Sequence, residues 1–217
     1  MRTPTGARER LVDTAMRLFG RRGYAAIGLN EIVDKSGAPK GSLYHYFPDG
    51  KEALAVEALA RGSALFLATL DEALGSSRSA AEAVRRIGAT LAGWMEDSKF
   101  RDGSPATTVT VEMAAISPAI RAEAAAGFAA WQARIAAALM RDGVPAARAR
   151  ELALLTVASL EGAMVLARAE ASARPIRGVT RMLAERLETA VNPAGAPAPA
   201  KPRARTAQRP RRAAAGR

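Results

Sequence analysis

The chain has 217 residues and no cysteine, and its 32 Lys and Arg outnumber its 21 Asp and Glu, for a formal net charge of +11. The absence of cysteine excludes disulfides, thiolate metal sites and a cysteine nucleophile. Hydrophobic residues make up 49% of the chain but aromatic residues only 5%, and a supply dominated by Ala, Leu and Val favours helices. A chain of this length forms one or two domains with a substantial core.

The positive charge is concentrated at the C-terminal end. Residues 192–217 contain seven Lys and Arg and no acidic residue, which leaves a net charge of only +4 for the preceding 191 residues. This Pro/Ala/Arg-rich segment buries too little apolar area to fold, so we predict a disordered basic tail. A basic tail on a nearly neutral body favours a polyanionic partner, either nucleic acid or an anionic membrane surface.

Three short helices are predicted in the first 50 residues. The segment 8–24 has apolar residues at positions 11, 15, 18 and 19 on one face, and Gly23 suits the position after its C-terminal end. A second helix within 28–37 stops at Gly37, and Pro39 suits the first position of a third helix that ends near 47–48. Two short helices joined by a tight glycine turn are typical of a helix-turn-helix.

Helical segments continue to about residue 190. A long helix is predicted from near Asp49 to residues 75–77. Later breaks are predicted at 75–79, 102–105, 117–118, 143–145 and 174–175. No segment sustains an alternation of apolar and polar residues, so we predict an all-α fold without a sheet.

The sequence predicts neither a secretory signal nor a membrane span. The N-terminus becomes amphipathic and charged within ten residues. The longest apolar run, 152–167, contains Glu161 and is shorter than the ~20 residues that a span requires. We therefore expect a soluble protein without a membrane partner.

Two parts of the sequence resemble a known family. The segments "AMRLFGRRGY" and "LNEIVDKSGAPKGSLYHYFPDGKEAL", within residues 8–59, resemble the N-terminal DNA-binding domain of the TetR family of bacterial transcription regulators. The segments "GSPATTVTVEMAAISPAIRAEAAAGFAAWQARIAAAL" and "SLEGAMVLARAEASARPI" resemble its LmrA/YxaF-type branch. The resemblance implies a DNA-binding domain at 5–65 with its helix-turn-helix at about 28–47, a helical ligand-binding and dimerisation domain at 66–190, and the tail at 191–217.

The predicted third helix carries side chains suited to reading DNA. The only histidine, His45, lies between two of the three tyrosines, shortly after a lysine and a glycine. Such polar side chains donate hydrogen bonds to phosphates or base edges, and the glycine lets the backbone approach the duplex closely. Two further residues, Asn30 and Lys51, lie where the resemblance implies backbone contacts. The predicted DNA-binding residues are Asn30, Lys40, Gly41, Ser42, Tyr44, His45 and Lys51, whereas Leu43 and Phe47 are predicted to face the core.

The sequence departs from the family pattern in two places. Family members commonly have Ser or Thr where Ile27 and Gly28 stand, so a hydroxyl that would cap the second helix and contact a phosphate is absent. Ser or Thr is also common at the position of Pro39, whose fixed φ suits the start of a helix.

A small-molecule pocket is predicted in the helical body. Pockets for lipophilic ligands are lined by aromatic and Met side chains with a few polar groups, and the resemblance implies that a ligand releases the DNA. Core packing is the alternative role for each candidate, and the candidates are Trp94, Met95, Thr107, Thr110, Met113, Phe128, Trp131, Glu161 and Met164. Burying Glu161 unpaired is costly, so it either pairs with an arginine, which is Arg168 or one across the dimer interface, or faces the ligand cavity.

The helix at 152–170 is apolar nearly all round, which is typical of a helix buried on two sides. By analogy with the family, it forms a four-helix dimer bundle together with residues 176–189. A two-fold homodimer places two recognition helices in successive major grooves ~34–36 Å apart, so we expect a near-palindromic operator.

Together these features predict a cytoplasmic, nucleoid-associated homodimer that is a sequence-specific transcriptional regulator, a repressor released from its operator by a small lipophilic ligand. The alternative is a basic architectural DNA-binding protein without ligand control. An enzyme is not expected, because Ser42 and His45 lack an orienting acid and an enclosed pocket. With one histidine and no cysteine, we also expect no metal site and no cofactor.

Overall fold

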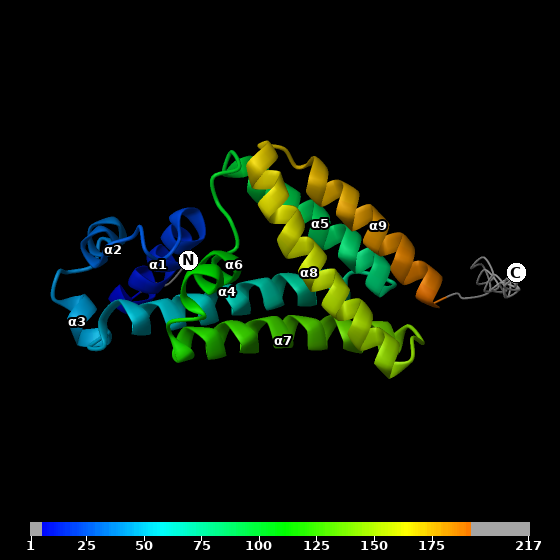
Figure 1. Ribbon diagram of the computed structural model, residues 1–217, viewed down its shortest axis with the longest axis horizontal. Helices are drawn as coiled ribbons and strands as arrows, with labels where there is room; N and C mark the ends of the chain where they lie inside the picture. The colour runs from blue at the N-terminus through cyan, green and yellow to red at the C-terminus, as the bar shows by residue number, and fades with distance from the viewer. Residues whose placement is uncertain (1–5, 192–217) are drawn as a thin grey trace, which may run out of the picture.

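The computed structural model describes residues 6–191, which form helices α1 to α9 and contain no β-strand (Figure 1). The bounds are α1 Ala7–Arg22, α2 Leu29–Ser36, α3 Ser42–Tyr46, α4 Gly50–Gly75, α5 Ala80–Asp97, α6 Pro105–Met113, α7 Pro118–Arg141, α8 Ala146–Glu170 and α9 Arg174–Val191. The predicted all-α fold is confirmed. The predicted basic tail lies outside the described residues.

Helices α1, α2 and α3 form a head at one end of the molecule, together with the first turns of α4 (Figure 1). Gly23 follows α1 with a φ of 82°, and Gly37 follows α2 in the left-handed conformation with a φ of 63°. Helix α3 starts three residues later than predicted. The reason is a turn at residues 39–42, in which the Ser42 N–H donates to the Pro39 carbonyl oxygen at 2.8 Å.

Two clusters of buried apolar side chains divide the long helix α4 between them. Its first turns contribute Leu54 and Leu59 to the core of the head, which also contains Phe19 and Leu43. Its last turns contribute Leu70 to the core of the body. A single continuous helix therefore transmits any displacement between the two cores.

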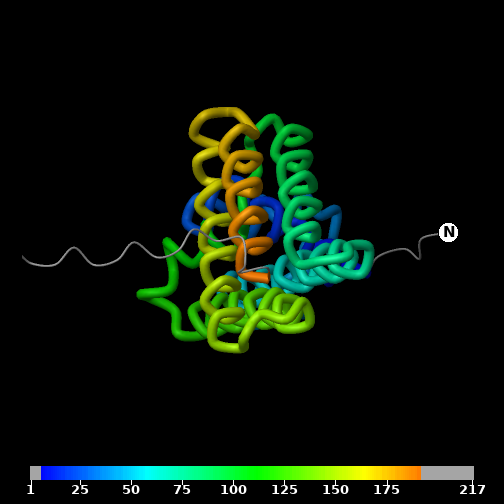
Figure 2. The backbone as a smooth tube through the Cα atoms, turned by 90° about the vertical axis from the view of Figure 1, so that its right-hand side faces the viewer, coloured from blue at the N-terminus to red at the C-terminus, as the bar shows by residue number. Residues whose placement is uncertain are grey.

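The body consists of two groups of helices. Helix α7 lies along α4, and α5, α8 and α9 lie side by side at an angle to that pair (Figure 1). Figure 2, turned by 90°, shows α5, α8 and α9 standing together over the α4 and α7 pair. The buried core of the body includes Ile87, Leu139, Leu152 and Ile176, which come from four of these helices.

Three of the predicted breaks between the body helices coincide with serine caps. The side chains of Ser79, Ser104 and Ser117 accept hydrogen bonds from the backbone N–H groups three residues later, at the starts of α5, α6 and α7. A serine oxygen at this position satisfies a backbone donor that the helix itself leaves unpaired. The last break falls at 171–173, just before the predicted position, and Ala171 there has a φ of 47°.

Helix α8 extends beyond the apolar run 152–167, whereas α4 has nearly the predicted bounds. Among the described residues, α4 and α8 have the length and the hydropathy of a membrane-crossing helix. The expectation from the run 152–167 is corrected here, because α8 continues on both sides of it. In this fold α4 packs on α1 and α7, and α8 packs on α7 and α9, but only 33% of the most apolar part of α4 and 39% of that of α8 are buried within the protein.

Candidate nucleic-acid interface and interior cavity

Helix α3 is anchored by two side chains and exposes the others. Leu43 is 1% exposed and packs in the core of the head, as does Phe47 just after the helix. Tyr44 is 65% exposed, and the adjacent His45 is also exposed. Leu43 and Phe47 are four residues apart and share one face, so the polar residues between them point to solvent as the sequence predicts.

A cleft of about 250 Å³ between α2 and α3 brings together three of the predicted DNA-binding residues. Asn30 from α2 and Tyr44 from α3 line this cleft with Lys40 from the turn between the helices. Asp34 lines it as well, and the sequence analysis did not identify it. An acidic group there repels phosphate and accepts hydrogen bonds from base amino groups instead.

The glycine at the start of α3 is not required by the fold. Gly41 has a φ of −73°, and a Cβ added to it meets no atom within 4 Å. Any residue fits this backbone, so the fold itself does not require a glycine here. Gly28 at the start of α2 makes no side-chain cap, as expected from the missing hydroxyl.

Lys51 is held away from the α2–α3 cleft. Its Nζ lies 4.1 Å from the centroid of the Tyr24 ring, a cation–π contact. Burial lowers the pKa of Lys51, and the Glu112 carboxylate partly opposes this shift. The sequence analysis missed Tyr24, which connects the loop after α1 with the start of α4.

The body contains two neighbouring pockets, an outer and an inner compartment, which share no lining residue and are together called the cavity. The outer compartment has a volume of about 350 Å³ and is lined by Met16, Leu65, Trp94, Met95, Asp102 and Met164, among others. It lies where α1, α4, α5 and α8 meet. The inner compartment, lined by Phe66, Leu91, Trp131, Leu160 and Glu161 among others, contains only about 10 Å³ of free space. An opening that small has room for about one water molecule.

The two compartments are neighbours along the same pair of helices. Leu91 and Met95 are four residues apart on α5, and Leu160 and Met164 are four apart on α8. Residues at this spacing lie one above the other on a helix face. The cavity therefore joins five of the nine predicted ligand-binding residues, which are Trp94, Met95, Trp131, Glu161 and Met164.

The other four predicted ligand-binding residues lie around this cavity and do not line it. Phe128 packs edge-on against the Trp131 ring, with the ring centroids 5.2 Å apart. Met113 packs on the core of the head, and the buried Thr110 hydroxyl has no hydrogen-bond partner within the described residues. Thr107 contacts the cavity indirectly, because its hydroxyl donates to the Glu161 carboxylate.

Glu161 is the acidic residue at the centre of the cavity. Burial raises the pKa of its carboxyl, and hydrogen bonds from Thr107 and Ser104 partly oppose that shift. Within the described residues it forms no ion pair with a basic side chain. The predicted pairing of Glu161 with Arg168 is wrong, and Glu161 lines the inner compartment. Arg168 instead donates to the carbonyl oxygens of Gly20 and Arg21.

The C-terminal end of α1 is held by the body at several points. The Thr108 hydroxyl on α6 donates to the Phe19 carbonyl oxygen at 3.1 Å, and Glu112 on α6 accepts from the Ala25 N–H at 2.7 Å. Arg168 on α8 binds the last carbonyls of α1. A carbonyl at a helix C-terminus favours a cationic donor. The head is thus connected to α6 and α8, the same helices that carry Thr107 and Glu161.

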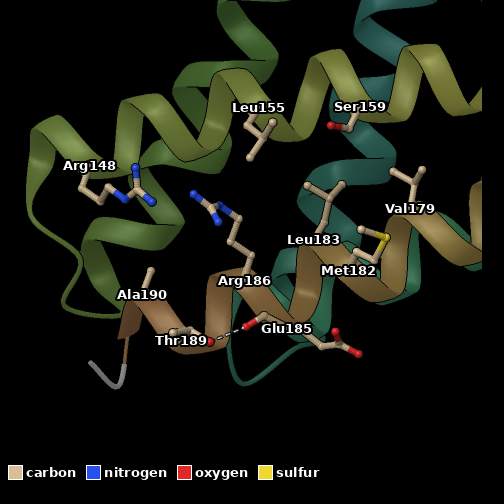
Figure 3. Close-up of a pocket in the computed structure, with 10 residues that line it drawn as sticks. All are labelled: Arg148, Leu155, Ser159, Val179, Met182, Leu183, Glu185, Arg186, Thr189 and Ala190. Carbon is tan, nitrogen blue, oxygen red and sulfur yellow. Dashed lines mark hydrogen bonds between the residues drawn. The ribbon is translucent and has the colours of Figure 1, made fainter. Parts of the chain in front are cut away.

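An apolar groove between α8 and α9 faces outward. Its volume is about 750 Å³, and Leu155, Val179, Met182 and Leu183 form its apolar part (Figure 3). Arg148 from α8 and Arg186 from α9 extend their guanidinium groups into one end of it (Figure 3). Exposed Leu154 and Val165 extend the apolar surface along α8. An exposed apolar surface of this kind is typical of a site that binds another protein.

These features define a helix-turn-helix protein with an exposed recognition helix and a separate helical body. Comparisons with known sequences agree. The family model for bacterial regulatory proteins of the tetR family matches residues 11–58, and the model for the C-terminal domain of LmrA/YxaF-like transcriptional regulators matches residues 80–182. The chain therefore belongs to the TetR family of transcriptional regulators, and within it to the LmrA/YxaF-like branch. It is a DNA-binding regulator and not an enzyme.

Individual relatives support the same assignment. The HTH-type transcriptional regulator YxaF of Bacillus subtilis is 36% identical over 160 residues, covering 74% of this chain and 84% of that protein. The HTH-type transcriptional repressor NemR of Escherichia coli is 40% identical over 74 residues, covering 34% of this chain and 37% of that protein. The crystal structure of the regulatory protein TetR from Rhodobacter sphaeroides superposes with a TM-score of 0.75 at 25% identity, covering 82% of this chain and 97% of that one.

Proposed function

We propose that this regulator is a homodimeric repressor that binds a near-palindromic operator and leaves it when a small lipophilic ligand enters the body. The observation that carries the proposal is the exposure of Tyr44 and His45 on a helix anchored by Leu43. Exposed Tyr and His side chains on a short helix contribute little to the stability of the fold. Their function is therefore to bind another molecule. Asn30 and Lys40 in the same cleft supply a further amide and a cation.

The proposal also assigns different functions to the two parts of the chain. Residues 5–65 bind the DNA, and residues 66–190 bind the ligand and dimerise. The two separate cores, one at each end of α4, support this division. The contacts of α1 with α6 and α8 support ligand control, because a ligand that prefers one arrangement of these helices lowers operator affinity by the same coupling factor. The relative NemR is named a repressor, which supports the sign of regulation.

The apolar groove between α8 and α9 supports the homodimer. A second copy related by two-fold symmetry presents the same surface, so apolar side chains on both copies become buried together. Gly162 on α8 adds to this argument, because a Cβ there meets no atom within 4 Å and the helix backbone is open to close approach. A cytoplasmic location near the nucleoid follows for a protein that binds chromosomal DNA.

The test is a double substitution, Tyr44→Ala with His45→Ala, in a band-shift titration with DNA fragments selected from the source genome. Each base or phosphate contact contributes about 1–3 kcal/mol, so operator affinity falls about 100-fold or more when two residues per protomer are lost. Val111→Ala on α6 is the control, since that side chain is 82% exposed and distant in sequence from α3. Unchanged affinity in the double variant contradicts the proposal, and footprinting checks for two symmetric half-sites.

A further inference from the structure

The cavity combines an apolar lining with one buried acid, and this combination restricts what it can bind. Trp94, Met95 and Met164 form much of the wall of the outer compartment. Glu161 lines the inner compartment and is three residues from Met164, which lines the outer compartment from the same helix. Its hydrogen-bond donors, Ser104 and Thr107, flank Pro105, which lines the outer compartment.

The basic groups nearest to the cavity are engaged elsewhere. Arg17 lines the outer compartment, but its guanidinium donates to the Asp13 carbonyl at 3.3 Å and to the Thr14 hydroxyl at 3.4 Å. Arg168 is directed to the end of α1. The other acid of the outer compartment, Asp102, has a partner in Arg21 at 3.4 Å. Among the described residues that line the cavity, Glu161 is therefore the acid whose charge no basic side chain balances.

We propose that the effector is a compact lipophilic cation, such as a protonated amine, whose ammonium group pairs with Glu161 while its apolar part lies against Trp94, Met95 and Met164. A carboxylate removed from water favours a cationic partner over a neutral one, and it repels an anion. Trp94 adds a cation–π surface and the methionines adapt to the shape of the apolar part. This inference rests on the ligand control proposed above.

The position of Glu161 also explains how such a ligand would be sensed. The Glu161 carboxylate accepts a hydrogen bond from Thr107 on α6, and the next residue, Thr108, donates to the Phe19 carbonyl of α1. An ammonium group competes with Thr107 for the same carboxylate. Pairing with the ligand therefore removes the link between α8 and α6, and with it part of the support of the head.

The experiment uses the full chain and three probes with the same hydrocarbon cage. At pH 7.5, 1-aminoadamantane is a cation, 1-adamantanol is neutral and adamantane-1-carboxylate is an anion. Binding is followed by intrinsic fluorescence, because the chain has two tryptophans, and Trp94 lines the outer and Trp131 the inner compartment. The amine is expected to bind at least about tenfold tighter than the alcohol, a difference of about 1.4 kcal/mol, and the carboxylate weakest.

Three variants assign the preference to one carboxyl. Glu161→Gln keeps the shape and is expected to reduce amine affinity to that of the alcohol, without changing alcohol affinity. Asp102→Asn is the matched control and keeps the preference for the amine. Thr107→Val removes the competing donor and is expected to strengthen amine binding. Circular dichroism checks that each variant is folded.

The inference is overturned if the amine binds no tighter than the alcohol, if no probe binds, or if Asp102→Asn and not Glu161→Gln removes the preference. Ligand control is tested separately by adding 1-aminoadamantane to the operator band shift. An amine that binds through Glu161 but leaves the operator complex intact supports the ligand class and contradicts ligand-controlled release. Release of the operator by the amine in the wild type, and its loss in Glu161→Gln, supports both.

Discussion

At the scale of single residues, Glu161 has the strongest consequences for stability. Its carboxyl is buried and accepts a hydrogen bond from the Thr107 hydroxyl, and no basic side chain in the described part of the chain forms an ion pair with it. A hydroxyl donor stabilises the ionised form less than a cation does. The free energy of unfolding of the ligand-free protein is therefore reduced whenever Glu161 is ionised.

This reduction predicts a pH dependence of definite sign. The folded state raises the pKa of Glu161 above its ordinary value of 4.5, so its contribution to stability is present below pH 4.5 and is lost as the pH rises through the folded-state pKa. Relative to Glu161→Gln, the wild type should lose up to about 1.4 kcal/mol per pH unit in that window, less where the carboxyl is partly solvated. Urea unfolding at pH 5 and pH 8, at one protein concentration, measures the difference.

The control for this measurement is Glu151→Gln, because Glu151 is exposed on the same helix and pairs with Arg148. Its stability difference from the wild type should be small and nearly constant over the same pH range. A constant difference for Glu161→Gln as well would show that burial does not disfavour the ionised carboxyl.

At the scale of elements, the turn between α2 and α3 contains two glycines with different roles. Gly37 has a φ of 63° and stops α2 in a conformation that a side chain disfavours. Gly41 has an ordinary φ and open space around it. The first glycine is required by the fold, and the second is required only if another molecule approaches the backbone.

The two glycines are therefore predicted to respond differently to alanine. Gly37→Ala should destabilise the protein by about 1–2 kcal/mol, because alanine in the left-handed region clashes with its own backbone. Gly41→Ala should change stability by no more than about 0.5 kcal/mol yet weaken operator binding, since its methyl group separates the helix from the phosphate. Chemical unfolding and band shifts on both variants measure these effects. A Gly41→Ala protein with full operator affinity would remove the argument for a close approach.

At the scale of the whole molecule, the outward face of α8 is more apolar than a monomer requires. Leu154 is 55% and Val165 54% exposed, eleven residues apart on one side of the helix. The groove beside α9 is lined by other residues of α8, among them Leu155 and Ser159 (Figure 3). Exposed apolar surface of this kind is typical of sites that bind another protein, and this surface contributes to the membrane-like hydropathy of α8.

Charges on this face are predicted to separate the dimer. Leu154→Arg with Val165→Arg should give a monomer at micromolar concentration in sedimentation velocity, because two cations per protomer would be buried without partners. Operator affinity should fall by about 100-fold or more, since one protomer binds only a half-site. Val111→Arg on α6 adds the same charge to another exposed apolar residue and should leave the dimer intact. A dimeric double variant would exclude this face as the interface.

The sequence by itself determined the helices, their breaks and the anchoring of α3. Gly23, Gly37 and the three capping serines mark ends that depend on residues close in the chain, and the burial of Leu43 and Phe47 follows from their spacing. The start of α3 was misjudged, because a proline suits both a helix start and the turn that is found at Pro39.

Only the tertiary structure decided which residues meet across the chain. Glu161 and Thr107 are 54 positions apart, and Arg168 reaches Gly20 across 148. Such pairs depend on how long helices cross, and alanine-rich helices carry little pattern that fixes a crossing. For the same reason, Met113 and Phe128 have the composition of a pocket lining but pack beside the cavity. Periodicity gives the face of each helix, whereas the partner of that face is set by the packing of the whole molecule.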